Sequence, residues 1–468
     1  MNLLQKFFSV QYLMKNIKKQ GELPSTKEVY DNVLNISMPA ITDTVLVALI
    51  SMVDTIMVSS LGAPAIAAVG ITGQPRMIIL CIFMALNTGL TSVVARRKGQ
   101  NNKDGANEVL SQTLFICSIL AIIISILGAV YARKLLMFAG ANNEIINMSV
   151  DYFVVLMIGI PFNIITFCIN GAQRGCGNTK ISMRINIVSN IVNLILNYFL
   201  INGHLGFPAL GVKGAAIATV IGNIVGFIMA IVSLSSRKEK FLNIKLKQMF
   251  TLNKKVLKPV FSIGASAGVE QLFFRIGFFL YVKIIASLGT TALATHNICG
   301  NLANLSFAFY DGLSMATASL FGQAMGRKRN DLAQLYAKSA EKVGIVISVI
   351  IIFIFVLFGK NLIGFFNKDD VILKMGYIVL LEIAITQPFQ SSQFIFSSCL
   401  RSAGDTKYTA FATMISVGIL RPIEAWILCY PLNLGLVGIW MSYFIDQGIR
   451  YVLCRNRFYT DTWKNINV

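Results

Sequence analysis

Asp54 is a carboxylic acid within the first long apolar stretch of the chain, and we expect it to be buried among Val53, Ile56 and Met57. An ionised side chain at bilayer depth costs at least about 2.5 to 3.5 kcal/mol, so an acid at this position needs a functional or structural reason. Burial disfavours the charged form of a carboxylic acid, and a bound cation favours it. We therefore predict that Asp54 exchanges a proton or a small cation. The alternative is an acid that hydrogen-bonds to helix neighbours and only fixes their packing.

Two amides in a later apolar stretch are candidate partners of this acid. Asn193 and Asn197 are four residues apart, so they share one face of a helix. Amide oxygens suit a hard cation such as sodium. We predict a site for sodium or a proton that contains Asp54, Asn193 and Asn197.

Other acids also fall within apolar stretches, and some have a basic residue at helical spacing. Asp446 and Arg450 are four residues apart. Arg421 and Glu424 are three apart, and both spacings bring side chains together on one helix face. We interpret both as structural ion pairs. The acids without such a partner are Asp43, Asp54, Glu270, Asp311 and Glu382.

Three of these unpaired acids are candidates for contact with a positively charged substrate. Carboxylates attract organic cations, and aromatic rings add cation–π attraction. The competing interpretation is that an aromatic residue or Met in an apolar helix faces lipid or the protein core. The residues predicted to line a substrate cavity are Glu270, Asp311 and Glu382 with Met315, Phe273 and Phe309.

The elements that must position these residues are membrane-spanning helices. Of the 468 residues, 55% are hydrophobic and only 13% are charged, against roughly 25% charged in a soluble domain, which excludes a soluble enzyme. About 20 helical residues cross the hydrocarbon core. We predict an all-α integral membrane protein with about twelve spans, at 33–59, 67–95, 108–131, 149–171, 183–202, 212–235, 259–286, 295–320, 339–358, 376–397, 408–430 and 434–454.

The chain is duplicated. RGCGNTK from Arg174 and RSAGDTK from Arg401 lie 401 − 174 = 227 residues apart, and SLGAPAIAAVGI from Ser60 and SLGTTALATHNI from Ser287 are again 227 apart. A third pair, which starts at Gly89 and Gly312, is 223 apart, and we attribute the difference to a small loop deletion. Internal duplication is typical of transporter halves that move against each other around a site between them.

The formal net charge of +20 follows the positive-inside pattern, because the basic clusters occupy alternate connections. We therefore expect a multi-pass protein of the bacterial cytoplasmic (plasma) membrane with both termini in the cytoplasm. Bacterial origin is suggested only by the compact loops and the Lys-rich, Ile-rich composition. The expected domains are a cytoplasmic tail (1–32, a surface helix or a loose tail), a six-helix bundle (33–235), a cytoplasmic linker (236–258), a second six-helix bundle (259–454) and a cytoplasmic tail (455–468).

Catalytic motifs are missing from the sequence. Gly175, Gly177 and Lys180 lack the GxxxxGK[ST] spacing of a phosphate loop. His204 and His296 are the only histidines, and neither has a Cys or carboxylate at metal-ligand spacing. We expect no enzymatic activity, no cofactor and no nucleic-acid partner.

At several of these residues the chain resembles the multidrug and toxic compound extrusion (MATE) family. The resemblance covers nearly all of residues 33 to 454. It rests on MVDTIMVSSLGAPAIAAVGI from Met52, IVNLILNYFLINGHLGFPALGVKGAAIAT from Ile191, SLGTTALATHNI from Ser287 and LRSAGDTK from Leu400. The resemblance implies two six-helix bundles related by a pseudo-twofold axis around a central cavity. It implies alternation between inward-open and outward-open forms, and we expect the chain to function as a monomer.

The family resemblance also implies site residues. Carried onto this chain, the family's amino-terminal cation site consists of Asp54, Asn193, Asn197 and Thr219. Asn197 stands where many relatives have Asp, so we expect the site to hold sodium less strongly or to favour a proton. One branch places acids on the seventh and tenth helices, where this chain has Phe274 and Gln390; we include Gln390 in the predicted substrate cavity. Glu270 lies one turn from Phe274 and is a candidate substitute for the missing acid.

We therefore expect an antiporter that expels organic cations or amphiphiles in exchange for sodium ions or protons. The second hypothesis is a related flippase that moves a lipid-linked saccharide. A flippase of an anionic cargo needs a cationic cavity, and Arg275 and Lys283 are the bases within apolar stretches outside the ion pairs above. The third is a receptor or scaffold without transport, which lone buried acids do not favour.

Overall fold

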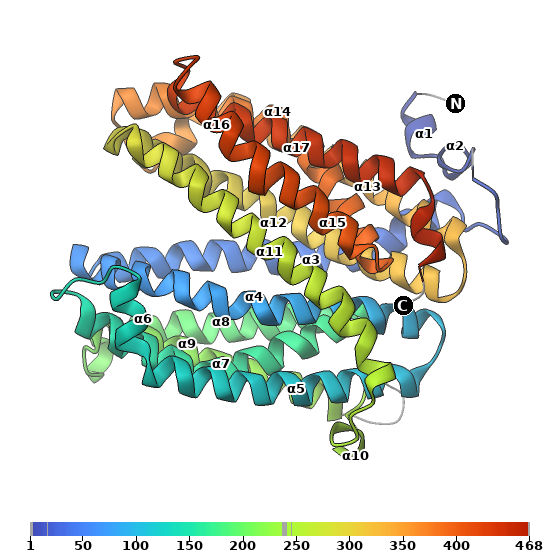
Figure 1. Cartoon of the computed structure of the whole chain (residues 1–468), viewed down its shortest axis with the longest axis horizontal. Helices are drawn as coiled ribbons and strands as arrows, with labels where there is room; N and C mark the ends of the chain where they lie inside the picture. Colours follow the sequence, from blue (N-terminus) through green and yellow to red (C-terminus); the bar gives the residue numbers. More distant parts are fainter. Residues whose placement is uncertain (1–2, 16, 236–240, 245, 467–468) are drawn as a thin grey trace. The chain divides into compact units, whose positions relative to one another are not determined.

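Helices make up the regular secondary structure of the chain. The computed structural model describes residues 3–15, 17–235, 241–244 and 246–466, and no strand occurs among them (Figure 1). The α-helices are α1 Leu3–Phe8, α2 Val10–Leu13, α3 Thr26–Ser59, α4 Ala63–Gly99, α5 Lys103–Val130, α6 Ala132–Phe138, α7 Ile146–Gly175, α8 Thr179–Asn202, α9 Gly211–Ser235, α10 Leu246–Met249, α11 Lys254–Ser287, α12 Thr290–Gly326, α13 Asn330–Gly364, α14 Asp370–Ser402, α15 Thr406–Thr413, α16 Arg421–Cys429 and α17 Gly435–Tyr459. Two short 3-10 helices, η1 His204–Gly206 and η3 Thr462–Asn465, and a π-helix, η2 Met414–Leu420, complete the set.

The long helices coincide with the twelve predicted spans. Among the described residues, nine helices are long and apolar enough to cross a membrane by length and composition. The helices α11, α12 and α17 have 34, 37 and 25 residues and match the other three predicted segments. The prediction of an all-α integral membrane protein is confirmed. The observed helices extend beyond the predicted spans because polar residues continue the same hydrogen-bonded helix past the apolar stretch.

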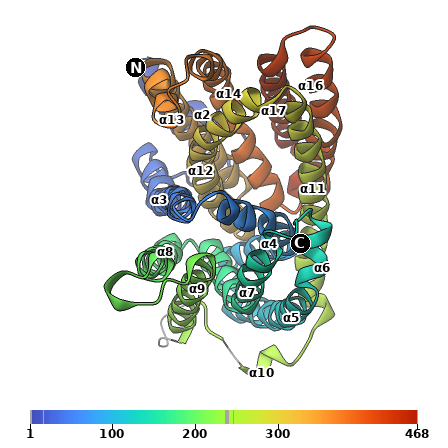
Figure 2. The same cartoon turned by 90° about the vertical axis from the view of Figure 1, so that its left-hand side faces the viewer.

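The chain divides into two compact units. Unit 1 contains residues Met1–Ile41 and Ala265–Val468, and unit 2 contains Thr42–Gly264. Within unit 2, α7 contacts α4, α5, α8 and α9, and these helices are seen nearly end-on in Figure 2. Within unit 1, α14 contacts α12, α13, α15 and α17. The unit boundaries fall inside α3 and α11, so each of these helices contributes to both units.

The predicted linker is partly held against α5. Residues 236–240 and 245 of this linker lie outside the described residues. In the described part, Asn107 accepts a hydrogen bond from the backbone N–H of Asn243 at 2.7 Å, and Gln112 donates to the backbone carbonyl of Thr251 at 2.8 Å. These side chains satisfy backbone groups that no helix or strand pairs.

The repeated phrases form repeated turns. Gly62 and Gly289 have φ values of 94° and 98°, and Gly177 and Gly404 have φ values of 84° and 87°. Positive φ is available to glycine without steric cost, which explains why glycine stands at the equivalent turn of each half. The loop deletion predicted from the third phrase pair is wrong. The helices α4 and α12 begin at 63 and 290 and end at 99 and 326, so both bounds keep the 227-residue offset.

One helix of unit 1 contains a π-helical turn. Residues Met414–Leu420 are π-helical between α15 and α16, and Pro422 follows within the first turn of α16. Proline lacks a backbone N–H, and its ring clashes with the carbonyl of the residue four before it, which favours a widened turn. A widened turn amounts to one inserted residue, so residues beyond it face a different direction than 3.6-residue spacing predicts.

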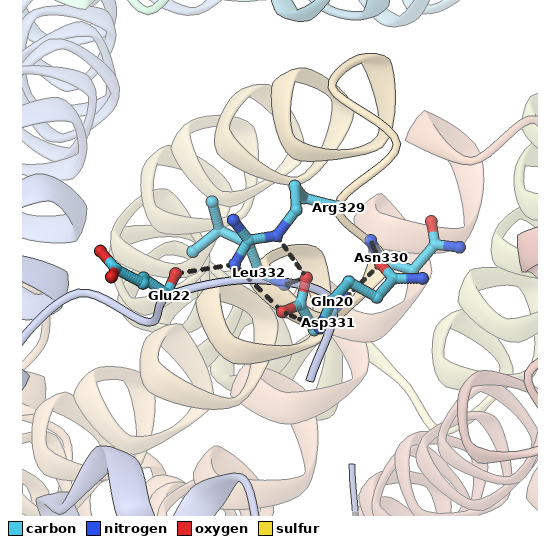
Figure 3. A network of polar contacts seen from close by, with 6 residues as sticks. All are labelled: Gln20, Glu22, Arg329, Asn330, Asp331 and Leu332. Carbon is cyan, nitrogen blue, oxygen red and sulfur yellow. Dashed lines mark hydrogen bonds and ion pairs between the residues drawn. The ribbon is translucent and has the colours of Figure 1, made fainter. Parts of the chain in front are cut away.

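The amino-terminal segment is docked on the start of α13 (Figure 3). Gln20 donates its backbone N–H to Asp331 Oδ2 at 2.9 Å, and its side-chain oxygen accepts from the backbone N–H of Asn330 at 2.7 Å. Arg329 donates to Asp331 Oδ1 at 2.9 Å and to the carbonyl of Glu22 at 2.8 Å. The hydrogen bond to Asp331 raises the pKa of Arg329, so this pair stays charged at neutral pH. We expected residues 1–32 to form either a surface helix or a loose tail. A loose tail does not describe the segment around Gln20 and Glu22, because it is hydrogen-bonded to α13 and the residue before it.

We expect Asp331→Ala to release this segment, because Gln20 and Arg329 both lose their carboxylate partner. Limited trypsin digestion should then cut after Lys18 or Lys19 about tenfold faster, since cleavage follows local opening. Asp370→Ala is the control, because Asp370 is an exposed acid in the first turn of α14. Equal cleavage rates in the two variants would contradict the docked arrangement.

Candidate cation site

Asp54 lies on α3 and faces two asparagines of α8. Asn197 donates from Nδ2 to Asp54 Oδ1 at 2.9 Å and also approaches Asn193 Oδ1 at 3.4 Å. The predicted shared face of Asn193 and Asn197 is therefore confirmed, and it is directed at Asp54. All of these residues belong to unit 2.

Thr219 of α9 closes the other side of the same cluster. Its hydroxyl lies 3.2 Å from the Asn193 side chain and donates to the carbonyl of Ala215 at 2.9 Å. When the Asn193 amide is turned so that nitrogen faces the acid, it donates to Asp54 Oδ2 at 3.3 Å and accepts from the Thr219 hydroxyl at 3.2 Å. In either orientation the three helices bring together Asp54, Asn193, Asn197 and Thr219.

The site is buried on the α8 side and open on the α3 side. Asn193 and Asn197 are only 6% and 2% exposed, whereas Asp54 is half-buried. Val53 and Ile56 are exposed, at 38% and 66%. The expectation that these apolar neighbours bury Asp54 is wrong, because helix geometry turns them away from the polar face. The two asparagines of α8, Asn193 and Asn197, cover the carboxylate instead.

The oxygen atoms of this cluster fit a small hard cation. Asn197 Oδ1 is buried and has no hydrogen-bond partner among the described residues. A buried acceptor without a partner carries a desolvation cost that a cation or a proton donor would remove. Carboxylate, amide and hydroxyl oxygens are the ligand types that sodium takes. No basic side chain forms an ion pair with Asp54 in the described part of the chain. Neutralisation of this carboxylate therefore requires a bound cation or a proton.

Asp43, predicted to be unpaired, has partners on two other helices. It lies 4.0 Å from Arg174 of α7 and accepts from Asn186 of α8 at 2.9 and 3.0 Å. Asp43 and Asp54 thus face the same side of α3 toward α8, as their eleven-residue spacing predicts. Asp54 differs from Asp43 because no arginine forms an ion pair with it among the described residues.

Glu270, also predicted to be unpaired, repeats this arrangement in unit 1. It binds Arg401 at 3.0 Å and accepts from the hydroxyls of Thr409 and Thr413 at 3.1 and 3.3 Å. Each residue of this cluster lies 227 residues beyond its counterpart in unit 2. Glu270 corresponds to Asp43 (270 − 43), Arg401 to Arg174 (401 − 174) and Thr413 to Asn186 (413 − 186). The prediction of two lone acids fails because both arginines come from a different helix. The repeat offset was the signal that could have found the pairs.

We expect Glu270→Gln to act on stability and not on substrate recognition, because Arg401 already occupies this carboxylate. Loss of a charge-assisted hydrogen bond in a partly exposed pair costs about 1 to 3 kcal/mol. Thermal unfolding of the purified protein measures the first effect. The concentration dependence of substrate efflux measures the second, and a shift of tenfold or more there would return Glu270 to the substrate cavity.

Arg421 pairs with Asp446 and not with Glu424 as its spacing predicted. Arg421 Nη2 donates to Asp446 Oδ2, and Arg450 Nη2 donates to the same oxygen at 3.1 Å. The predicted pair of Asp446 with Arg450 is confirmed. The predicted pair of Arg421 with Glu424 is wrong because α17 offers Arg421 the fully buried carboxylate of Asp446. Glu424 Oε2 has no hydrogen-bond partner among the described residues.

The other residues predicted to line the substrate cavity lie on α11, α12 and α14 of unit 1. Gln390 is fully buried and accepts from the Tyr443 hydroxyl at 3.1 Å. Glu382 is half-buried, and its Oε2 has no hydrogen-bond partner in the described part of the chain. Phe309 packs on the apolar core of unit 1, and the ring of Phe273 lies beside Gly418. The remaining two, Asp311 and Met315, are half-buried on α12.

Comparisons with known proteins agree with the duplicated fold. The MatE family model matches residues 39–199 and 267–427. The uncharacterized transporter YisQ of Bacillus subtilis (strain 168) is 29% identical over 414 residues, which cover 88% of this chain and 90% of the relative. The probable multidrug resistance protein NorM of Thermotoga maritima is 26% identical over 461 residues, covering 97% and 96%.

Solved structures share the fold. A crystal structure of MATE in complex with MaL6 superposes with a TM-score of 0.87 at 23% identity and covers 97% of this chain and 98% of its own. A transporter of the MOP superfamily from Pyrococcus furiosus, described as having a binding pocket of reverse polarity, gives a TM-score of 0.86 at 23% identity with the same coverage. The helix arrangement of this chain is therefore a known transporter fold.

Proposed function

Since the chain belongs to the MatE family, we propose that it is a secondary active exporter that expels organic cations or amphiphiles in exchange for sodium ions or protons. The observation that carries this proposal is the carboxylate of Asp54, which has amide partners but no basic partner in the described part of the chain. An acid with an arginine partner, such as Asp43, is already neutralised. Asp54 needs a mobile positive charge for the same purpose.

The coupling ion binds among Asp54, Asn193, Asn197 and Thr219. Sodium is held by the carboxylate and by amide and hydroxyl oxygens, after the Asn197 amide turns its oxygen toward the ion. A proton instead converts Asp54 to a neutral acid that donates to Asn193 or Asn197. Either event removes the cost of a charge at bilayer depth.

The ion drives export only if it binds the two conformations of the transporter unequally. When one monovalent ion is exchanged for one monovalent organic cation, no net charge crosses the membrane, so the ion's concentration gradient supplies the free energy. A tenfold gradient supplies about 1.4 kcal/mol, enough for a tenfold concentration ratio of the substrate. The outward-open form exposes Asp54 to the higher ion concentration, and the inward-open form receives the substrate. Pro39, Pro161 and Pro388 lie inside α3, α7 and α14 and allow these helices to bend.

We propose a small organic cation or amphiphile as the substrate; the NorM relatives are named probable multidrug resistance proteins. Glu382 and Asp311 are the acids we assign to substrate contact, together with Phe273, Phe309 and Met315. We propose a monomer in the bacterial plasma membrane with both termini in the cytoplasm. The bundle limits 33–235 and 259–454 and the linker 236–258 remain predictions.

Transport in proteoliposomes tests this function. Purified protein is reconstituted, and a sodium gradient and a pH gradient are imposed separately at zero membrane potential. We expect one of the two gradients to drive ethidium against its concentration difference and the other to have little effect. Ethidium movement that ignores both gradients would reject antiport.

The flippase hypothesis has less support. A flippase of an anionic lipid-linked saccharide needs free cationic groups that line a cavity. Arg421 and Arg450 of unit 1 are already paired with Asp446. Of the two bases considered for this hypothesis, Lys283 is exposed and Arg275 is half-buried. Transport of a lipid-linked saccharide with no response to ethidium or to ion gradients would favour it.

A further inference from the structure

Unit 1 contains a counterpart of the cation site, and the duplication locates it residue by residue. The turn after α3 and the turn after α11 carry SLG at 60 and 287, so Asp54 corresponds to 54 + 227, which is Tyr281. Gly211 and Gly435 begin α9 and α17 with φ of 54° each. Thr219 lies eight residues beyond the first, so it corresponds to Tyr443.

The counterpart of α8 requires the π-helix to be taken into account. In unit 2 the backbone N–H of Leu210 donates to the carbonyl of Leu200 at 2.9 Å, and in unit 1 Leu434 donates to Leu428 at 3.1 Å. A Cβ on Gly214 would lie 2.3 Å from the Leu200 oxygen, and a Cβ on Gly438 would lie 2.8 Å from the Leu428 oxygen.

These two equivalent contacts set the offset after the π-helix at 428 − 200 = 228, one more than the 227 before it. Asn193 therefore corresponds to 193 + 228, which is Arg421, and Asn197 corresponds to Ala425. The inserted residue of the π-helix thus places an arginine where unit 2 has the central amide of its cation site.

The Arg421 guanidinium occupies this counterpart site. Its carbon lies 5.8 Å from the centroid of the Tyr281 ring and 5.2 Å from that of Tyr443, the counterparts of Asp54 and Thr219. Arg421 is 3% exposed, and the small Ala425 beside it is fully buried. The carboxylate of Asp446, one turn beyond Tyr443, accepts from the guanidinium.

A guanidinium at this place behaves as a cation that cannot leave. Arginine stays protonated in proteins, and its side chain is covalently attached. The two aromatic faces and one carboxylate supply the favourable contacts that oxygen ligands supply in unit 2. The counterpart site is therefore filled in every conformation, whereas the site at Asp54 can load and unload.

We propose that Arg421 is the tethered substitute for an exchangeable cation in unit 1, so that this transporter binds and exchanges one coupling cation, at Asp54. This inference rests on the proposed antiport function. In unit 1 the positive charge is therefore supplied by the Arg421 side chain and not by a bound ion.

Counting bound cations tests the proposal without transport. Purified protein is titrated with radioactive sodium, and protons released on addition of ethidium are followed with a pH-sensitive dye. We expect one cation per chain for the unaltered protein and for Arg421→Lys, which keeps the positive charge, and none for Asp54→Asn. A second cation in the unaltered protein, or one that persists in Asp54→Asn, would overturn the inference because it shows an exchangeable site elsewhere.

A gain-of-site variant adds a positive test. Tyr281→Asp with Arg421→Asn installs in unit 1 the acid and the amide of unit 2, and we expect a folded double variant to bind two cations. One cation in a monodisperse double variant would contradict a latent site at Arg421. If the double variant does not fold, the counts for the unaltered chain and Asp54→Asn decide the question.

The ion-to-substrate ratio gives an independent readout. At zero potential, an ion gradient of about tenfold holds an ethidium gradient of about tenfold when one ion is exchanged, and of about a hundredfold when two are exchanged. We expect about tenfold for the unaltered chain. A ratio near a hundredfold would contradict the proposal. Absence of ion-driven ethidium movement with one bound cation would reject the antiport function and leave the cation count of the inference intact.

Discussion

Asp54→Asn is expected to abolish ion-driven export while the protein still folds. The substituted amide can keep a hydrogen bond with Asn197, so the contact between α3 and α8 survives. It cannot bind a proton or balance the charge of sodium, and the ion gradient then does no work on the substrate. With a tenfold ion gradient, the accumulation ratio should fall from about tenfold to about one. Efflux of ethidium from energised cells or proteoliposomes measures this ratio.

The control for this variant is Asp151→Asn, which changes an exposed acid on α7 of the same unit. We expect normal accumulation from the control. Both proteins should elute as single species and unfold at similar temperatures. Ion-driven accumulation that survives in Asp54→Asn would remove this residue from the coupling mechanism.

Asp446→Asn should cause the largest loss of stability of any single acid substitution in unit 1. This side chain is fully buried and is the shared acceptor of Arg421 and Arg450. Its removal leaves two buried guanidinium groups without their counter-charge. Breaking a buried ion pair by removing one partner costs about 3 to 5 kcal/mol. Thermal unfolding of the purified protein should show a drop of several degrees or a loss of folded protein.

Asp461→Asn is the matched control, because it removes the acid of an ion pair at the surface. Asp461 binds Lys464 at 2.6 Å, but the Asp461 side chain is 46% exposed. Surface ion pairs contribute about 0 to 1 kcal/mol, so this variant should unfold almost as the unaltered protein does. Equal stabilities of the Asp446 and Asp461 variants would mean that the buried network does not stabilise unit 1.

The fold could be predicted from the sequence because its signals are local. Each span is an apolar stretch longer than the hydrocarbon core is thick, and the turns between spans carry glycines such as Gly177 and Gly404 at positions with positive φ. The duplication added a second copy of each signal. The helix ends were less predictable, since polar residues continue α4 and α12 well past the apolar stretch.

The cation site was predictable in part for the same reason. Asn193 and Asn197 share a face because of helix periodicity. The contact of Asn197 with Asp54 was expected because buried polar groups need hydrogen-bond partners. Thr219 has no local signal. Only the family resemblance pointed to it, because its position depends on how α9 packs on α8.

The ion pairs were the weakest predictions because their partners are distant in the sequence. Spacing along one helix suggested Arg421 with Glu424, but the buried Asp446 of α17 determines the actual pair. Asp43 and Glu270 each bind an arginine of another helix. Helical spacing cannot reveal such pairs, whereas the shared 227-residue offset can.

The most direct test of the central role of Asp54 is substrate-driven ion movement. Proteoliposomes at zero potential contain the purified protein and receive an ethidium gradient but no ion gradient, while internal sodium and pH are recorded. We predict that ethidium moving down its gradient drives sodium ions or protons in the opposite direction, although no ion gradient is imposed. In Asp54→Asn we predict ethidium movement without ion movement, or no movement at all. Ion movement of equal size in the unaltered protein and in Asp54→Asn would contradict the account.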